Sequence, residues 1–161
     1  MAKLKRYIEE EFAFFVTTIT KGRSPLFVDS KLCRILLVTI EYYKTVFDFQ
    51  VYGYCLMPDH LHILLKPGGK FNLSFIMKMI KGSFARKVNR LSNKEGSIWQ
   101  AGFYDEAVRS EKQLFNQIEY MHQNPVRANL AAVPEEYPFS SFGQYHGLSY
   151  SEGFILKVDP L

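Results

Sequence analysis

The chain has 161 residues, 47% of them hydrophobic, and a formal net charge of +4 at pH 7. We therefore predict one globular domain over residues 1–161 that is large enough to bury a core. Two cysteines are too few for a disulfide framework or a cysteine zinc site. The isoelectric point near 9.0 favours an anionic partner only mildly, because many proteins without such a partner share it.

The sequence also argues against a membrane protein. No stretch approaches the roughly 18 consecutive apolar residues of a membrane span. Glu9, Glu10 and Glu11 interrupt any apolar signal segment near the N-terminus. We therefore expect a soluble, cytoplasmic protein that does not bind a membrane.

The strand and helix patterns follow one another in the order strand, helix, strand, strand, helix, strand and helix. Aromatic and β-branched side chains mark the strands, and apolar side chains three and four residues apart mark the helices. Asp29 or Ser30 is placed to cap the first helix, and Pro125 to end the last. The predicted boundaries are 12–20, 29–47, 49–57, 60–66, 72–91, 103–109 and 111–124.

The first six segments give the order β-α-β-β-α-β. This is the split βαβ arrangement of a ferredoxin-like α+β fold, in which an antiparallel sheet carries helices on one face. The seventh segment adds a C-terminal helix. No repeat, linker or second domain interrupts the pattern.

The strand 60–66 begins with the tetrad Asp59-His60-Leu61-His62. Side chains alternate along a strand, so His60 and His62 would point the same way with Cα atoms about 6 to 7 Å apart. Two neutral imidazoles and an oxygen donor can hold a divalent ion and leave positions open for a phosphate. The alternative is that each histidine is a core residue bonded to a carbonyl, with Asp59 only shaping the turn.

The helix 72–91 combines an apolar stripe with an unbalanced basic surface. The stripe that would pack on the sheet contains Leu73, Met77, Ile80, Phe84, Val88 and Leu91. Basic side chains occupy the rest of the circumference: Lys78, Arg86 and Arg90 point outward, and Lys81 and Lys87 flank the stripe. Such a face suits contacts to nucleic-acid phosphates, although it can equally be a solvated charged surface.

The helix 111–124 separates an apolar arc from a polar face. The arc contains Leu114, Phe115, Ile118, Met121 and His122. Tyr120 lies off this arc with Asn124 one turn later. A phenol is a competent nucleophile, and an amide oxygen can bind Mg²⁺ or Mn²⁺. The alternative is a solvent-facing tyrosine beside an asparagine that ends the helix. Arg109 and Arg127 either clamp a phosphate near this tyrosine or are surface residues.

Three stretches in this order resemble the single-tyrosine HUH transposases, also called IS200-like transposases, and most closely the REP-associated tyrosine transposases. They are MPDHLH at 57–62, IWQ with FYD within 98–105, and EYMHQNPVRA at 119–128. The resemblance covers roughly residues 8–145. It implies cleavage and joining of single-stranded DNA, at a hairpin or palindromic repeat, through a covalent 5′-phosphotyrosine that leaves a free 3′-hydroxyl.

The resemblance also implies the roles of individual residues. His60 and His62 match the metal ligands, Tyr120 the nucleophile, and Asn124 the third ligand, where relatives from insertion sequences carry glutamine. The cofactor would be Mg²⁺ or Mn²⁺. Single-stranded or hairpin DNA and a second copy in a homodimer would be the partners, and the nucleoid the place of action. The charge pattern described above, and not the resemblance, gives the predicted DNA contacts: Lys78, Lys81, Arg86, Lys87, Arg90, Arg109 and Arg127.

Two other functions fit the same residues. The first is a nucleic-acid-binding module without catalysis, in which the histidines are structural. The second is a metal-dependent phosphodiesterase that uses water in place of Tyr120. No HExxH spacing is present, which excludes a zinc protease of that type.

Overall fold

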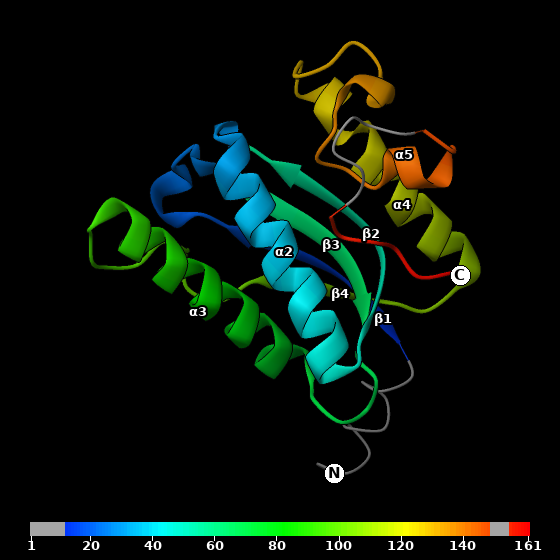
Figure 1. The fold of residues 1–161 in the computed structure, drawn as a ribbon. Coiled ribbons are helices and arrows are strands. Elements are labelled where there is room, and N and C mark those ends of the chain that lie inside the picture. Colours follow the sequence, from blue (N-terminus) through cyan, green and yellow to red (C-terminus); the bar gives the residue numbers. More distant parts are fainter. Residues whose placement is uncertain (1–11, 149–154) are drawn as a thin grey trace.

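The computed structural model describes residues 12–148 and 155–161, so the residues Glu9, Glu10 and Glu11 lie outside the described residues. Four strands form one antiparallel sheet in the order β2-β3-β1-β4 (Figure 1). Their bounds are β1 Ala13–Ile19, β2 Gln50–Met57, β3 His60–Lys66 and β4 Tyr104–Val108. This strand order confirms the predicted ferredoxin-like sheet.

Two helices of the ferredoxin-like core, α2 Ser30–Phe47 and α3 Leu73–Ser92, lie together on one face of the sheet (Figure 1). Their starts follow from short polar caps: Asp29 accepts a hydrogen bond from the Lys31 backbone, and Asn72 from that of Phe75. The sheet side of this core contains every second residue of β3: Leu61, Ile63 and Leu65. The intervening positions, which include both histidines, therefore face away from α2 and α3.

The helix α4 Glu111–Arg127 packs on the opposite face, against a smaller core. Ile118 and Met121 are buried there. Gly53 on β2 permits the close approach, because a Cβ atom at that position would lie 2.8 Å from Met121 Cε. The prediction that Pro125 ends this helix was wrong. The helix continues to Arg127, since a proline this close to the end removes only one intrahelical hydrogen bond.

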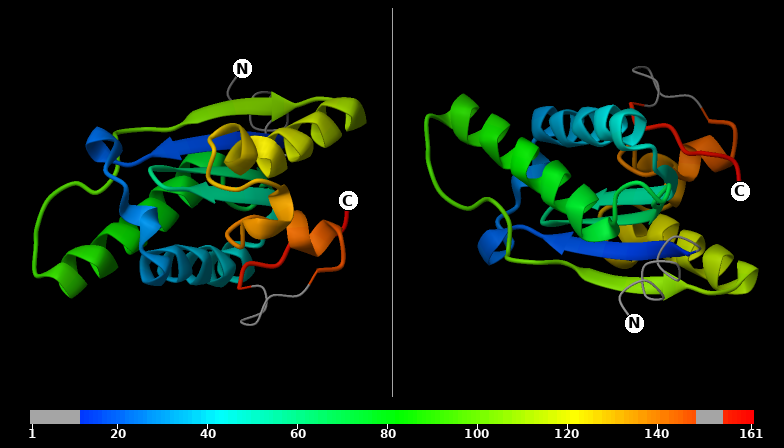
Figure 2. Two further views of the ribbon diagram at one scale, coloured as in Figure 1. Left: turned by 90° about the horizontal axis from the view of Figure 1, so that it is seen from above. Right: turned by 90° about the horizontal axis from the view of Figure 1, so that it is seen from below.

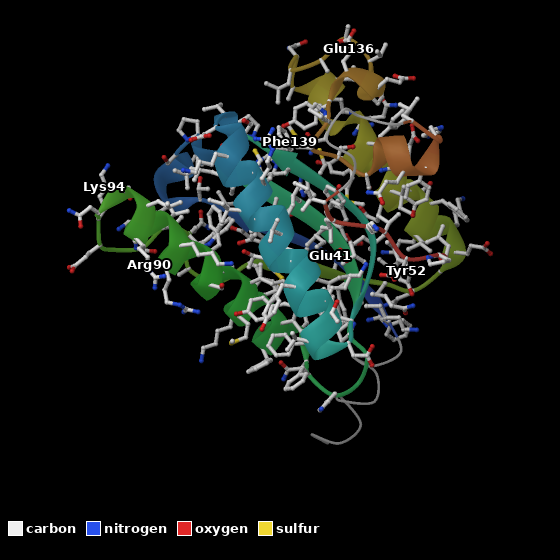
Figure 3. All side chains as sticks on the ribbon, viewed as in Figure 1. Glu41, Tyr52, Arg90, Lys94, Glu136 and Phe139 are labelled. Carbon is white, nitrogen blue, oxygen red and sulfur yellow. The ribbon has the colours of Figure 1, made fainter. Side chains whose placement is uncertain are left out.

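The C-terminal segment closes the outer edge of β2. The Leu56 amide donates to the Phe139 carbonyl at 2.8 Å, and the Ser141 amide donates to the Tyr54 carbonyl at 2.9 Å. Figure 3 shows Phe139 beside the upper part of the sheet. After these contacts come the short helix α5 Phe142–Tyr145 and the described end of the chain. At the other edge, no described strand pairs with the outer side of β4, which runs along the margin of the molecule in Figure 2.

Two apolar residues differ from their predicted surroundings. Leu91 and Phe115 fall at helical spacing with buried residues, yet they are 56% and 50% exposed. Trp99 is buried against Phe27 and Phe84, and its indole donates to the Lys81 carbonyl.

None of the described helices is long and apolar enough to span a membrane.

Candidate active site

The two histidines of β3 converge on one point. His60 and His62 project from the face that carries α4, and their Nε2 atoms are 3.2 Å apart. Each ring is held through its other nitrogen, by Asp59 for His60 and by Thr17 for His62. Both Nε2 atoms are therefore directed to the same space.

Asp59 sets the orientation of the His60 ring. His60 Nδ1 donates to Asp59 Oδ1 at 2.6 Å, and because a carboxylate can only accept, the neutral ring keeps a lone pair on Nε2. The other carboxylate oxygen pairs with the guanidinium of Arg23 at 3.3 Å. Burial alone would raise the pKa of Asp59, but the hydrogen bond from His60 and the charges of His60 and Arg23 hold that pKa below its usual value. The aspartate thus orients the imidazole and does more than shape the turn.

His62 is fixed from the neighbouring strand. Thr17 pairs with His62 in the β1–β3 register, and its hydroxyl lies 2.8 Å from His62 Nδ1. Phe15 stacks on the same imidazole with ring centroids 5.2 Å apart. Burial, followed by the charge of His60, lowers the pKa of His62 to about 3. His62 is therefore neutral at physiological pH, which is the form that binds a metal ion.

This pair fits a divalent metal ion. Two ligands at right angles, each about 2.1 Å from a metal, lie about 3.0 Å apart. The observed 3.2 Å separation is close to that value, and it is also the distance of a hydrogen bond from one ring to the other when one Nε2 carries a proton. The described residues contain no cluster of three or more His, Cys, Asp and Glu side chains suited to a metal.

Tyr120 lies beside the histidines. Its ring centroid is 5.7 Å from that of His62 and 6.0 Å from that of Phe15, in edge-on contacts. The guanidinium of Arg127 lies over the Tyr120 ring, 5.2 Å from its centroid. The side chain is still 42% exposed, so an incoming strand can reach the phenol. Asn124 follows one helical turn later on α4 and is partly buried.

Part of the polar face of α4 is turned toward the sheet, whereas Asn116 and Tyr120 on the same face stay exposed. The side-chain amides of Gln113 and Gln117 donate to the Glu106 carboxylate on β4, at 3.0 and 3.3 Å. These bonds hold α4 at the angle that places Tyr120 over β1 and β3. The opposite side of the helix, with Met121 and His122, is buried toward β2 and the C-terminal segment.

The structure separates the predicted DNA-binding cations into groups. Lys81 donates to the carbonyls of Gln100 and Gly102, and Lys87 donates to the Thr39 hydroxyl on α2, so both side chains tie structural elements together. Lys78, Arg86 and Arg90 are exposed, and Figure 3 shows Arg90 pointing outward from α3. This helix lies on the face of the sheet that is opposite to the histidines. DNA binding by these five residues stays a prediction.

The two predicted phosphate clamps lie at different ends of the sheet. Arg127 touches the Tyr120 ring. Arg109 follows Val108, which pairs with Ala13, whereas His60 pairs with Ile19. Six residues of strand separate these rows, or about 20 Å. Arg109 lies instead over the ring of Phe12 and is not brought to the histidines.

The family model described as "Transposase IS200 like" matches residues 9–124, which include both histidines and Tyr120. The chain belongs to the IS200-like transposase family. A REP-associated tyrosine transposase of Escherichia coli strain K12 is 26% identical over 145 residues, covering 88% of this transposase and 83% of that protein. A Haemophilus influenzae protein provisionally given the same name is 26% identical over 155 residues, covering 88% and 86% of the two chains.

A solved structure confirms the fold of this IS200-like transposase. It is described as the REP-associated tyrosine transposase bound to a REP hairpin, and it superposes with a TM-score of 0.75 at 22% identity. The superposition covers 94% of this chain and 90% of that one. The resemblance drawn from three short motifs is therefore confirmed over nearly the whole chain.

Sequence reasoning missed three residues of the site. Thr17 is the only polar side chain on its face of β1, a signal that period-2 alternation could have revealed. Phe15 precedes it on the same face. Arg23 has a backbone φ of 52° in the turn after β1, and no local pattern predicts its pairing with Asp59 across 36 residues.

Proposed function

We propose that this transposase cleaves and rejoins single-stranded DNA through a covalent 5′-phosphotyrosine on Tyr120. One observation carries the proposal: the Tyr120 ring lies against His62, and the Nε2 atom of His62 converges with that of His60. A nucleophile and a metal-binding pair are thus within reach of one phosphate. The membership in a transposase family supports the same chemistry.

Each residue of the site has a separate role in the proposed reaction. His60 and His62 would hold Mg²⁺ or Mn²⁺, and Asn124 is the candidate for a third protein ligand. When bound, the ion would polarise a phosphate oxygen and stabilise the charge that develops on it. Asp59 and Thr17 keep both rings in the orientation that directs Nε2 to this point. Arg127 lies beside the phenol, where its guanidinium can bind a phosphate oxygen and fix the scissile bond.

The reaction exchanges one phosphodiester for another. Tyr120 Oη attacks the scissile phosphorus and loses its proton to solvent. The bond from phosphorus to the 3′ oxygen breaks, and this oxygen takes up a proton to become a free 3′-hydroxyl. The 5′-phosphate stays on the phenol. Attack by a 3′-hydroxyl reverses the step, so rejoining strands requires no nucleotide cofactor.

The proposed substrate is single-stranded DNA next to a hairpin. The solved relative is described as bound to a REP hairpin, and its fold is shared over 94% of this chain. The site here is solvent-accessible at Tyr120 and is flanked by Arg23 and Arg127. Cations at the rim would attract the phosphate backbone. A homodimer is part of the proposal, and size-exclusion chromatography with light scattering would test it.

The experiment uses labelled oligonucleotides from the flanks of the gene, with Mg²⁺ or Mn²⁺, and denaturing electrophoresis. We expect a metal-dependent band of DNA linked to protein, which is absent in Tyr120→Phe and His60→Ala. Tyr42→Phe, on the other face of the sheet, is the matched control and should keep the band. Metal-dependent cleavage without a linked band would favour a phosphodiesterase, and binding without cleavage would favour a binding module.

A further inference from the structure

Tyr104 is an aromatic side chain beside the site that the proposed chemistry does not use. It is the first residue of β4 and pairs with Thr17, which in turn pairs with His62. Directly paired residues of antiparallel strands point to the same face, so Tyr104 shares the face of the histidines. Its Cα atom lies two strand spacings from that of His62, or about 10 Å.

The ring of Tyr104 is open to a ligand. Tyr104 is 64% exposed, and its ring stacks on no other ring and forms no cation–π contact within the described residues. Other aromatic side chains around the site are engaged: Phe15 with His62, and Tyr120 with His62 and Arg127. A large aromatic ring that is exposed at the edge of a functional site can stack on a flat ligand group such as a base.

One open direction for a DNA strand leads past Tyr104. On the β2 side, α4 and the segment that contains Phe139 and Ser141 cover the sheet. On the β4 side the sheet ends without a further described strand, and Figure 2 shows β4 along the margin of the molecule. A strand held at the histidines can therefore extend over Thr17 and past Tyr104.

The charges next to Tyr104 favour a base over a phosphate at this position. Glu106, two residues later on β4, is exposed and shares the face of Tyr104, whereas Asp105 between them points to the opposite face. Glu106 is fixed by the amides of Gln113 and Gln117 and carries a charge that no described cation pairs. The Glu106 carboxylate repels the DNA backbone, which stays with the cations Arg23 and Arg127.

We propose that Tyr104 stacks on an unpaired base close to the scissile phosphate. The contact uses the face of the base, which every base has, so it would select single-stranded DNA without selecting a sequence. It would also fix the backbone on one side of the scissile bond, which helps to place the phosphorus before Tyr120. This inference rests on the proposed function, because it assumes that the site binds DNA.

The test scans 2-aminopurine along a single-stranded oligonucleotide bound to the Tyr120→Phe protein, which cannot form the phosphotyrosine. We expect fluorescence quenching at one or two adjacent positions. Tyr104→Ala should abolish the quenching and raise the Kd about 5- to 150-fold, and Tyr104→Trp should retain both. Tyr42→Ala is the matched control, because Tyr42 is 61% exposed on α2 and far from the histidines.

The outcomes separate this inference from the proposed function. Quenching that persists in Tyr104→Ala, or a Kd change no larger than that of Tyr42→Ala, would overturn it. If Tyr104→Ala converts the protein from dimer to monomer and leaves the quenching unchanged, a second copy covers the Tyr104 ring, and the stacking inference would be overturned as well. Tyr104-dependent quenching without any DNA-linked wild-type protein would refute the proposed cleavage and leave the stacking intact.

Discussion

Replacing Asp59 by asparagine should weaken metal binding without removing a metal ligand. Asp59 Oδ1 accepts a hydrogen bond from His60 Nδ1 at 2.6 Å. Asparagine can still accept this bond, but it loses the negative charge that strengthens the bond and raises the basicity of Nε2. Loss of such a partner typically lowers metal affinity about 10- to 100-fold, which corresponds to about 1.4 to 2.7 kcal/mol.

The assay measures the yield of DNA-linked protein against Mn²⁺ concentration. We expect the half-saturating concentration for Asp59→Asn to rise about 10- to 100-fold, with the rate at saturating Mn²⁺ nearly unchanged. Arg23→Gln is the comparison at saturating DNA: it removes a rim cation and the exposed ion pair to the same carboxylate, worth about 0–1 kcal/mol, and should leave the half-saturating Mn²⁺ concentration nearly unchanged. Equal half-saturation for Asp59→Asn and the wild type would refute the assigned role of Asp59.

Three further changes probe other parts of the structure. Burial and the charge of His146 lower the pKa of His122 to about 4, so below pH 6.5 the unfolded chain binds a proton that the folded chain excludes, and stability falls. Between pH 7 and pH 5, the free energy of unfolding measured in urea should therefore fall by about 2 kcal/mol less for His122→Gln than for the wild type. Equal losses in the two proteins would contradict this. Lys81→Ala should lower the free energy of unfolding by about 1–3 kcal/mol, because it removes the donor to two loop carbonyls. Arg90→Ala is the control, and an equally small effect of the two substitutions would show that the Lys81 hydrogen bonds are weak. Arg127→Ala should slow the formation of DNA-linked protein at least about 10-fold. Arg109→Ala is the control and should not slow it, because the Arg109 guanidinium also lies 5.2 Å from an aromatic ring but far from the histidines. Equal slowing in both variants would argue against a phosphate contact at Arg127.

Local rules predicted the elements and the histidine pair well. Asp29 and Asn72 are caps whose side chains satisfy backbone donors within three residues, and this local pattern is why the sequence placed the first cap at Asp29 or Ser30 and the start of the other helix at about residue 72. The convergence of His60 and His62 follows from the alternation of a strand. The strand order follows from the β-α-β-β-α-β sequence of elements.

The surroundings of the site depend on contacts between distant parts of the chain. Thr17 meets His62 across 45 residues, and the C-terminal segment bonds to β2 across more than 80. No periodicity encodes such pairings. The sequence placed Tyr120 on the polar face of its helix, but only the packing of α4 against the free face of the sheet turns that polar face toward the histidines.

The central claim is that the nucleophile is the Tyr120 phenol. The direct measurement is mass spectrometry of the wild-type protein after reaction with a single-stranded oligonucleotide in Mn²⁺, followed by digestion with nuclease and protease. Our account predicts a nucleotide joined through its 5′-phosphate to the peptide that contains Tyr120. A modification on another residue, or cleaved DNA with no modified peptide, would contradict it.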